Sequence, residues 1–200
     1  MPTTNYQRFI IGYHGCCESV VEKVLKDGSD LEHSQNDFDW LGRGTYFWEY
    51  APDRALEWAN HSKKINGKIK TPSVIVAYIH LGNCFDLLDI RNTMALRKLF
   101  PHFCEFCKKS GKAIPENKAA RKDPSDELVL RYLDCAMINW YMDQVAKVGN
   151  PFQTVRCAFV EGDPVFAGSK IMLKTHVEIA VIDKSCIVGY FRPRVDTLIA

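Results

Sequence analysis

The sequence predicts an α+β fold in a single domain that spans residues 1–200. Short strand-like runs stand near both ends of the chain with helix-like runs between them, which favours α+β over a βαβ repeat. The composition, 46% hydrophobic and 25% charged residues, is typical of a globular chain with a buried core. No internal repeat and no Gly/Ser-rich linker divides the 200 residues, a length that suits one domain.

The N-terminal half of the chain alternates strand-like and helix-like runs. The β-branched and aromatic run at 8–13 (RFIIGY) predicts a buried strand, and the segment 18–26 predicts a short helix. Residues 27–45 are polar and rich in turn residues, which predicts a long loop. The apolar stripe of the segment 50–65 predicts a second helix, and the run at 73–80 (SVIVAYIH) predicts a second strand.

The C-terminal half begins with helix-like segments and ends with strands. Apolar spacing predicts a helix at 91–109 and another at 130–145, for which Ser125 and Asp126 are candidate caps. Three strand-like runs close the chain, at 154–160, 177–182 and 186–191.

Composition also excludes several classes of protein. No run approaches the roughly 18 apolar residues that a membrane-spanning helix needs, so we expect no membrane partner. The N-terminus lacks the basic and long apolar regions of a secretory signal. The formal net charge of +2 is too small to indicate a nucleic-acid partner by itself.

The cysteines predict a cytoplasmic protein without a metal. Several lie within apolar runs, which is typical of small core residues in a reducing compartment. Cys104 and Cys107 have CxxC spacing and His102 lies nearby, but no second pair completes the four ligands of a structural zinc site. The eight cysteines are Cys16, Cys17, Cys84, Cys104, Cys107, Cys135, Cys157 and Cys186.

Two stretches are basic. Residues 108–122 carry six positive side chains and one acidic one, Glu116, and residues 63–70 carry four lysines and no acid. The ordinary interpretation is two solvated loops. The sharper interpretation is a surface that binds phosphate groups or an acidic partner.

Tyr13-His14-Gly15 is the first segment with features of a site. We expect the strand to end there, leaving His14 exposed to hydrogen-bond a ligand hydroxyl and Gly15 open to a close approach by a ligand. A structural histidine at a strand end is the ordinary alternative.

The second such segment is LGRGTYFW, from Leu41 to Trp48. Its two glycines permit a tight turn, and the aromatic side chains that follow offer flat faces to a planar ring. It is not a dinucleotide-binding GxGxxG motif, because no strand precedes it and no third glycine follows. Aromatic residues in this position are also common in hydrophobic cores.

The third segment contains His176 and Glu178 on a predicted strand. Residues two apart on a strand point to the same face, so both polar side chains lie on one face while Val177 and Ile179 point to the other. A carboxylate on such an apolar strand is costly unless it faces a cleft or has a partner.

Together the three segments resemble the ADP-ribosyltransferase fold. The similarity is to its poly(ADP-ribose) polymerase and diphtheria-toxin-like branch, whose signature is His, Tyr and Glu in that order on three strands. The segment GRGTYF is similar to that branch's GKGIYF, and the motifs extend over nearly the whole chain. The resemblance implies a split β-sheet core flanked by helices, with an NAD cleft between the sheets.

The resemblance also implies a role for individual residues toward NAD⁺, which would be a substrate and not a permanently bound cofactor. His14 would bind a hydroxyl of the adenosine ribose, and the backbone of Gly15 would pair with the nicotinamide carboxamide. Tyr46 would stack on the nicotinamide ring, with Phe47 beside it and Trp58 as a second stacking aromatic. Glu178 would be the catalytic glutamate, so that His14, Tyr46 and Glu178 form the catalytic set.

Three further residues are candidates for recognising the acceptor. His176 stands two residues before Glu178, where related branches place a target-recognition residue. Glu161 and Phe166 belong to a loop-like segment with two glycines and a proline, a region that often contacts the acceptor in the family. Glu161 is also the rival candidate for the catalytic carboxylate.

The implied reaction is transfer of ADP-ribose from NAD⁺ to a nucleic acid or a protein, with nucleic acid slightly favoured. Cleavage at the ribose leaves an oxocarbenium-like sugar, which a fixed carboxylate stabilises, and nicotinamide leaves as a neutral molecule. By analogy the chain resembles a small bacterial toxin or phage-defence effector with an antitoxin partner. The alternatives are an NAD-dependent RNA 2′-phosphotransferase-like enzyme and an inactive NAD- or ADP-ribose-binding module.

Overall fold

The computed structural model of the chain describes residues 5–120 and 128–194. Within these residues it has six strands and four α-helices, an α+β architecture as the sequence predicts. The candidate caps Ser125 and Asp126 lie outside the described residues, as do Arg121 and Lys122 of the first basic stretch.

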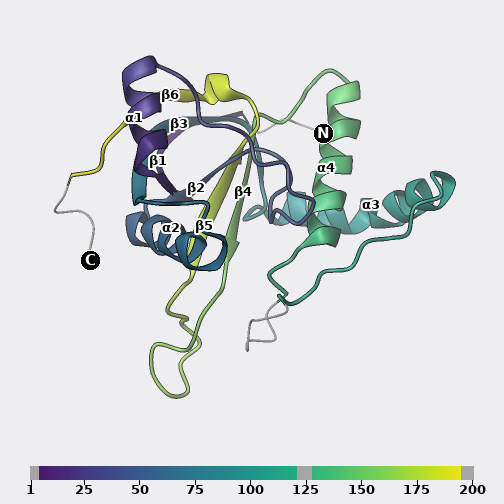
Figure 1. Ribbon diagram of the computed structural model, residues 1–200. Helices are drawn as coiled ribbons and strands as arrows, with labels where there is room; N and C mark the ends of the chain where they lie inside the picture. Colours follow the sequence, from purple (N-terminus) through teal and green to yellow (C-terminus); the bar gives the residue numbers. More distant parts are fainter. Residues whose placement is uncertain (1–4, 121–127, 195–200) are drawn as a thin grey trace.

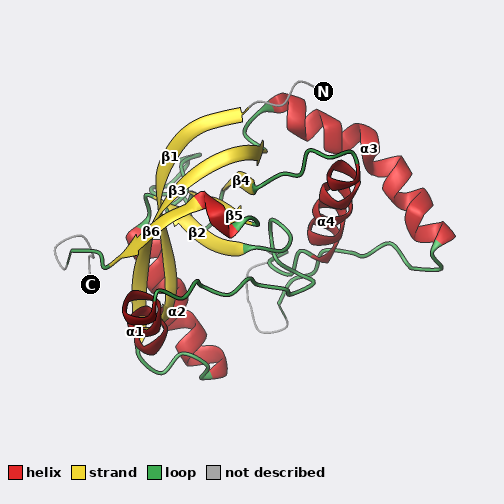
Figure 2. Ribbon diagram, turned by 90° about the horizontal axis from the view of Figure 1, so that it is seen from above, coloured by secondary structure: helices red, strands yellow, loops and turns green. Residues whose placement is uncertain are grey.

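The six strands form one mixed sheet (Figures 1 and 2). Its order is β1-β2-β5-β4-β3-β6, and β1 also pairs with β3, so five of the strands close on themselves and β6 lies at the edge. The strands are β1 (Asn5–Cys17), β2 (Thr45–Glu49), β3 (Pro72–Asp86), β4 (Thr154–Phe159), β5 (His176–Val181) and β6 (Ile187–Phe191).

The sheet has two three-stranded halves joined by short ladders. One half consists of β1, β3 and β6, in which β1 and β3 pair over eleven positions. The other consists of β2, β5 and β4. Only two residue pairs join β1 to β2, and three join β3 to β4. The expectation of two separate sheets is therefore wrong, because these two ladders connect the halves into one sheet.

Helices cover both halves (Figure 2). α1 (Glu18–Asp27) and α2 (Pro52–Asn66) pack against β1 and β3. α3 (Ile90–Lys109) and α4 (Tyr132–Lys147) pack against each other, and α4 buries Ile138 and Tyr141 against Val155 of β4 and Ala180 of β5. A short 3₁₀-helix, η1 (Lys184–Cys186), precedes β6.

Two strands are longer than their local sequence indicates. β1 continues through Gly15 to Cys17, and β3 continues to Asp86, because their long common ladder holds both chains extended. The residues TYFWE form β2 although the alternation pattern does not predict a strand there. Both faces of β2 carry buried side chains, so no polar alternation marks it.

Residues 160–175, the β4–β5 loop, project from the sheet (Figure 1). A bridge between Pro164 and Met172 holds the two sides of the loop together, and Phe166 is 67% exposed beyond it. No helix in the described part of the chain is both long and apolar enough to cross a bilayer.

All eight cysteines are free thiols. Five of them are buried, as expected for core residues: Cys16, Cys84, Cys107, Cys135 and Cys186.

Candidate functional site

His14 lies within β1 and not at its end, and its side chain is half-buried, which corrects the expectation of an exposed strand-end histidine. The β1–β2 ladder contains Gly12 and Tyr13 and ends just before His14. The His14 imidazole bonds the backbone carbonyl oxygen of Tyr46 on β2, with 2.7 Å between Nδ1 and O. A carbonyl oxygen accepts only, so Nδ1 carries the hydrogen. Burial lowers the pKa of His14, which favours the neutral ring. Nε2 is therefore a free hydrogen-bond acceptor.

Tyr46 connects β2 to the glycine-containing turn before it. Its hydroxyl accepts a hydrogen bond from the backbone N–H of Leu41 at 2.8 Å and donates one to the carbonyl oxygen of Gly42 at 2.6 Å. Burial, followed by the nearby Asp39 carboxylate, raises the pKa of the phenol far above its ordinary value. Gly42 has φ 76°, in the left-handed region that favours glycine. Tyr46 is thus neutral and held in one orientation.

Glu178 lies on the strand next to Tyr46. In the β2–β5 ladder Tyr46 pairs with Ala180 and Trp48 with Glu178, so Tyr46, Trp48 and Glu178 share one face of the sheet. Glu178 is 8% exposed, and its Oε1 lies 3.3 Å from Nε2 of His176. Among the described residues no hydrogen-bond donor contacts Oε2, which leaves that oxygen available to a ligand.

His176 is 6% exposed, so its imidazole is not presented at the surface as acceptor recognition would require. Its Nδ1 lies 2.7 Å from the carbonyl oxygen of Lys174 and 3.5 Å from Oε2 of Glu161. Burial disfavours a charge on His176, but the Glu178 carboxylate and the Lys174 carbonyl outweigh it, and the pKa of His176 is raised.

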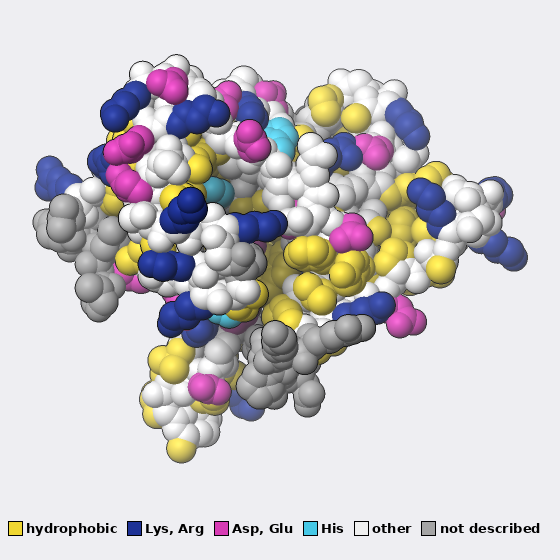
Figure 3. Space-filling model, viewed as in Figure 1, with side chains coloured by type: hydrophobic (Ala, Val, Ile, Leu, Met, Phe, Trp, Pro, Cys, Tyr) yellow, Lys and Arg dark blue, Asp and Glu magenta, His cyan; other side chains and the backbone are white. Residues whose placement is uncertain are grey.

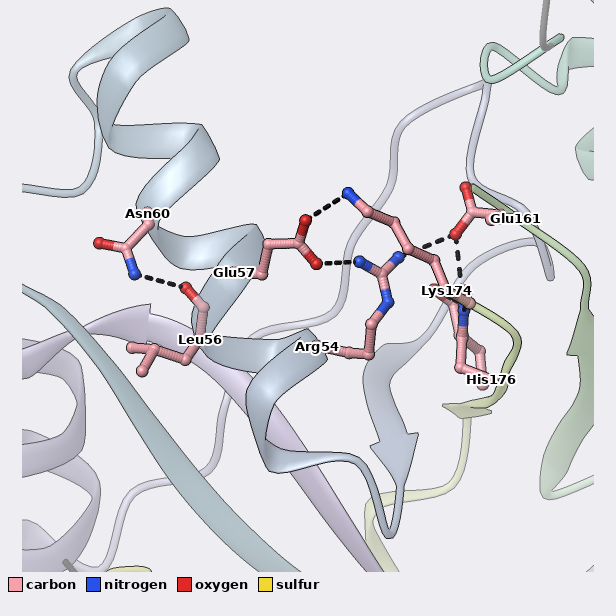
Figure 4. Close-up of polar contacts among 8 residues, drawn as sticks. Arg54, Leu56, Glu57, Asn60, Glu161, Lys174 and His176 are labelled. Atoms are coloured by element: carbon pink, nitrogen blue, oxygen red, sulfur yellow. Dashed lines mark hydrogen bonds and ion pairs between the residues drawn. The ribbon is translucent and has the colours of Figure 1, made fainter. Parts of the chain in front are cut away.

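Glu161 belongs to an ion-pair network with α2 (Figure 4). Nη2 of Arg54 lies 2.8 Å from Oε2 of Glu161, and a second nitrogen of Arg54 binds Glu57. Glu57 also binds the ammonium group of Lys174. Both ends of the β4–β5 loop are therefore held against α2, a connection that no local sequence pattern indicates.

Several residues expected to contact NAD⁺ have other roles. Phe47, which the resemblance places among the NAD-binding residues, is fully buried in the hydrophobic core, so its ring has no open face for a ligand in this structure. Gly15 faces α2, and a Cβ atom there would lie 2.1 Å from the carbonyl oxygen of Ala55. Its small size thus serves helix packing. Trp58 is 45% exposed, and its ring lies 6.1 Å from Trp48, so the second aromatic pairs with Trp48.

Trp48 is a residue that the sequence interpretation left without a role. It pairs directly with Glu178, it is 7% exposed, and its indole Nε1 has no hydrogen-bond partner among the described residues. The available signal was its position two residues after Tyr46, which puts both aromatic rings on one face of β2.

Two grooves flank the network around Glu161. The larger, of about 640 Å³, lies between α2 and the β4–β5 loop, and the smaller, of about 280 Å³, borders Glu161 and α4. Neither is lined by His14, Tyr46 or Glu178, which differs from the expected cleft between two sheets. Lining residues of the larger groove include Arg54, Glu57 and Lys174, and those of the smaller include Trp40, Arg131 and Glu161.

The first lysines of one basic stretch lie far from the second basic stretch. α3, whose end carries Lys108 and Lys109, projects away from the sheet, whereas Lys63 and Lys64 belong to the last turn of α2 (Figures 1 and 2). Lys109 is paired with Glu105 at 2.8 Å. In Figure 3 the Lys and Arg side chains of one face are scattered among Asp and Glu, while hydrophobic side chains gather on the projecting loop and beside α4. The stretches do not form one basic track.

Across residues 5–120 and 128–194, no group of three or more His, Cys, Asp or Glu side chains is arranged to hold a metal ion. The site offers Nε2 of His14, the aromatic faces of Tyr46 and Trp48, and a carboxylate in contact with a histidine. Comparison with models of known protein families and with curated proteins found no match to this chain.

Proposed function

We propose that the chain is an enzyme that transfers ADP-ribose from NAD⁺ to a macromolecular acceptor. The observation that carries the proposal is the assembly of His14, Tyr46 and Glu178 on three consecutive strands, β1, β2 and β5. The His14 imidazole binds the backbone of Tyr46, and Tyr46 and Glu178 are diagonal neighbours on one face. The three residues thus come from neighbouring strands in the order that the sequence motifs indicate, and the His14 ring packs against Phe47, with 5.8 Å between the ring centroids.

The hydrogen bonds of His14, Tyr46 and Glu178 leave each side chain with the atoms that its proposed role toward NAD⁺ needs. Nε2 of His14 accepts a hydrogen bond from a ribose hydroxyl, because Nδ1 already carries the ring hydrogen. Tyr46 offers its ring to nicotinamide while its hydroxyl stays bound to the preceding turn. Oε2 of Glu178 binds a ribose hydroxyl and stabilises the positive charge that develops at the sugar. Nicotinamide leaves as a neutral molecule, so the reaction needs no separate acid.

The low exposure of the site adds to the electrostatic part of this proposal. The side chain of Glu178 is 11% exposed, and the attraction between a carboxylate and a developing cation is stronger where water is excluded. Trp48 is a second aromatic ring on the face of β2 that carries Tyr46 and adjoins Glu178. Entry of NAD⁺ then requires displacement of the groups that cover Glu178, and the grooves beside the Glu161 network offer a route of approach.

The acceptor is proposed to be a nucleic acid or a protein that meets the β4–β5 loop. Phe166 is exposed on this loop and can stack on a base or fill an apolar pocket of a protein. The separation of the two basic stretches removes the continuous track that favoured nucleic acid, so the exposed aromatic is the remaining support for that class.

Labelled NAD⁺ tests the proposal directly. Protein, NAD⁺ labelled in the adenylate part and whole-cell lysate are incubated, and the products are divided between protease and nuclease treatment. We expect label in a macromolecule, and a loss of about 10²–10³-fold in rate for Glu178→Gln, which keeps volume but removes the charge. Because that contact is made mainly in the transition state, NAD⁺ affinity should change little.

The same experiment distinguishes the alternatives. Label released by nuclease indicates a nucleic-acid acceptor, and label released by protease indicates a protein. Binding of NAD⁺ without transfer or hydrolysis, equal in the wild type and in Glu178→Gln, would instead identify an inactive binding module. Full activity of Glu178→Gln together with loss in Glu161→Gln would move the catalytic role to Glu161.

A further inference from the structure

A continuous series of contacts connects Glu178 to α2 through His176 (Figure 4). Nε2 of His176 lies 3.3 Å from the Glu178 carboxylate, and Nδ1 lies 3.5 Å from the Glu161 carboxylate. Glu161 is bound by Arg54 at 2.8 Å. The side chains of His176 and Glu161 are 1% and 15% exposed, so these charges interact with little screening by water.

The partners of His176 require a doubly protonated ring. Nε2 faces a carboxylate oxygen, and Nδ1 faces a carbonyl oxygen and a second carboxylate. A neutral imidazole has one N–H, so one of its nitrogens would present a lone pair to an acceptor. The imidazolium donates from Nδ1 to the Lys174 carbonyl and from Nε2 to Glu178, and its positive charge attracts the Glu161 carboxylate.

The charged groups near His176 come from four parts of the chain, and two aromatic rings pack against it. β5 contributes Glu178, the start of the β4–β5 loop contributes Glu161, and α2 contributes the cation Arg54, which is itself bound to Glu161. The rings of Trp40 and Phe159 pack against the imidazole. One further cation is near: Arg131 lies over Trp40, 3.8 Å from the ring centroid. The two carboxylates contact the imidazole directly, whereas each of the two cations is bound to another group. The net effect of these charges therefore favours the protonated ring.

We propose that His176, as an imidazolium, is a positioning residue that holds Oε1 of Glu178 and ties it to Glu161 at the base of the β4–β5 loop. With Oε1 held, Oε2 is directed toward the substrate. This inference rests on the proposed function, since Glu178 is taken as the group that stabilises the sugar cation. It differs from an acceptor-recognition role, because His176 acts on the carboxylate and does not contact the acceptor.

The proposal predicts a pH dependence with a definite sign. The positioned state needs the proton on His176, so activity is full at low pH and falls as the pH rises through the pKa of His176. That pKa lies above the ordinary value of about 6.5. The fall in activity should therefore occur above pH 6.5.

Three activity measurements test the role. In His176→Gln we expect kcat to fall by about 10²-fold, the effect of misplacing a reacting group by about 1 Å, with KM for NAD⁺ nearly unchanged. Hydrolysis of NAD⁺ without acceptor should fall by the same factor as transfer. The decline above pH 6.5 should disappear. His61→Gln, on the exposed surface of α2, is the matched control and should retain both rate and pH profile.

The outcomes separate positioning from recognition. If His176→Gln lost transfer but kept full NAD⁺ hydrolysis, the residue would serve the acceptor and the proposal would be overturned. An unchanged pH profile in His176→Gln would overturn it as well. A variant that fails to fold is replaced by His176→Phe, which keeps a planar ring against Trp40 and Phe159 and should show the same loss.

A titration by NMR tests the contacts independently of the reaction. The imidazole of His176 should titrate above the ordinary value of about 6.5 in the wild type, and Glu178→Gln or Glu161→Gln should lower its pKa toward that value. This result would hold even if no ADP-ribose transfer were found, so failure of the proposed function remains distinguishable. A pKa for His176 at or below the ordinary value of about 6.5 would refute the imidazolium and with it the proposal.

Discussion

Arg156 provides a bridge between the two sheet halves that substitution can test. From the middle of β4 its guanidinium group binds Glu49, the last residue of β2, through Nε at 2.6 Å and Nη2 at 3.2 Å. It also binds Asp86, the last residue of β3, through Nη1 at 3.1 Å. The three side chains are 6–8% exposed. The ion group thus connects β2 to β3, which do not pair in the sheet.

Replacing Arg156 with Leu leaves two buried carboxylates without a cation. Removal of one partner from a buried ion pair costs about 3–5 kcal/mol, because the remaining charge keeps its desolvation penalty. With a urea m-value of about 2 kcal/mol/M, the midpoint of unfolding should fall by about 1.5–2.5 M while m stays constant. The unfolding midpoint of Arg156→Lys should fall less than that of Arg156→Leu, since the ammonium group retains the charge but loses the fork geometry.

Urea unfolding followed by circular dichroism measures this effect, and Arg43→Leu is the matched control. Arg43 pairs with Asp143 at the surface, where the two side chains are 43% and 50% exposed, so its loss should cost no more than about 1 kcal/mol. An equal loss in the two leucine variants would refute the reasoning.

Two further predictions concern the site. Gly15→Ala should destabilise the fold by about 1–3 kcal/mol in thermal unfolding, because the added Cβ would meet the Ala55 carbonyl at 2.1 Å, whereas Gly189→Ala has open space and should be neutral. Equal melting temperatures for Gly15→Ala and Gly189→Ala would mean that α2 shifts to accommodate the added Cβ without loss of stability. Burial lowers the pKa of His14, so its contribution to stability is full above about pH 6.5 and is lost as the pH falls toward the folded-state pKa. Unfolding free energies between pH 5 and 8 should show that slope in the wild type and a smaller one in His14→Gln, and identical slopes would count against a buried neutral His14.

Local sequence patterns predicted most of the elements because they depend on short-range spacing. The helix predicted at 91–109 is α3 (Ile90–Lys109), and the strand predicted at 177–182 is β5 (His176–Val181), each within one residue of its observed bounds. The prediction failed for β2, whose two faces are both buried, and for the ends of β1 and β3, where a long-range ladder extends the chain past residues of low strand propensity.

The three segments that contain His14, Tyr46 and Glu178 stand out in the sequence, and the resemblance to a known family gave these residues their proposed parts. The surroundings of these residues are not visible in the sequence. Phe47 and Tyr46 are neighbours in the chain, and strand pairing sends one ring into the core and leaves the other beside Glu178. The contacts of His176 with Glu161, and of Arg156 with Glu49, join residues 15 to more than 100 positions apart. Such contacts depend on strand register and helix packing, which bring together charges that no local pattern relates.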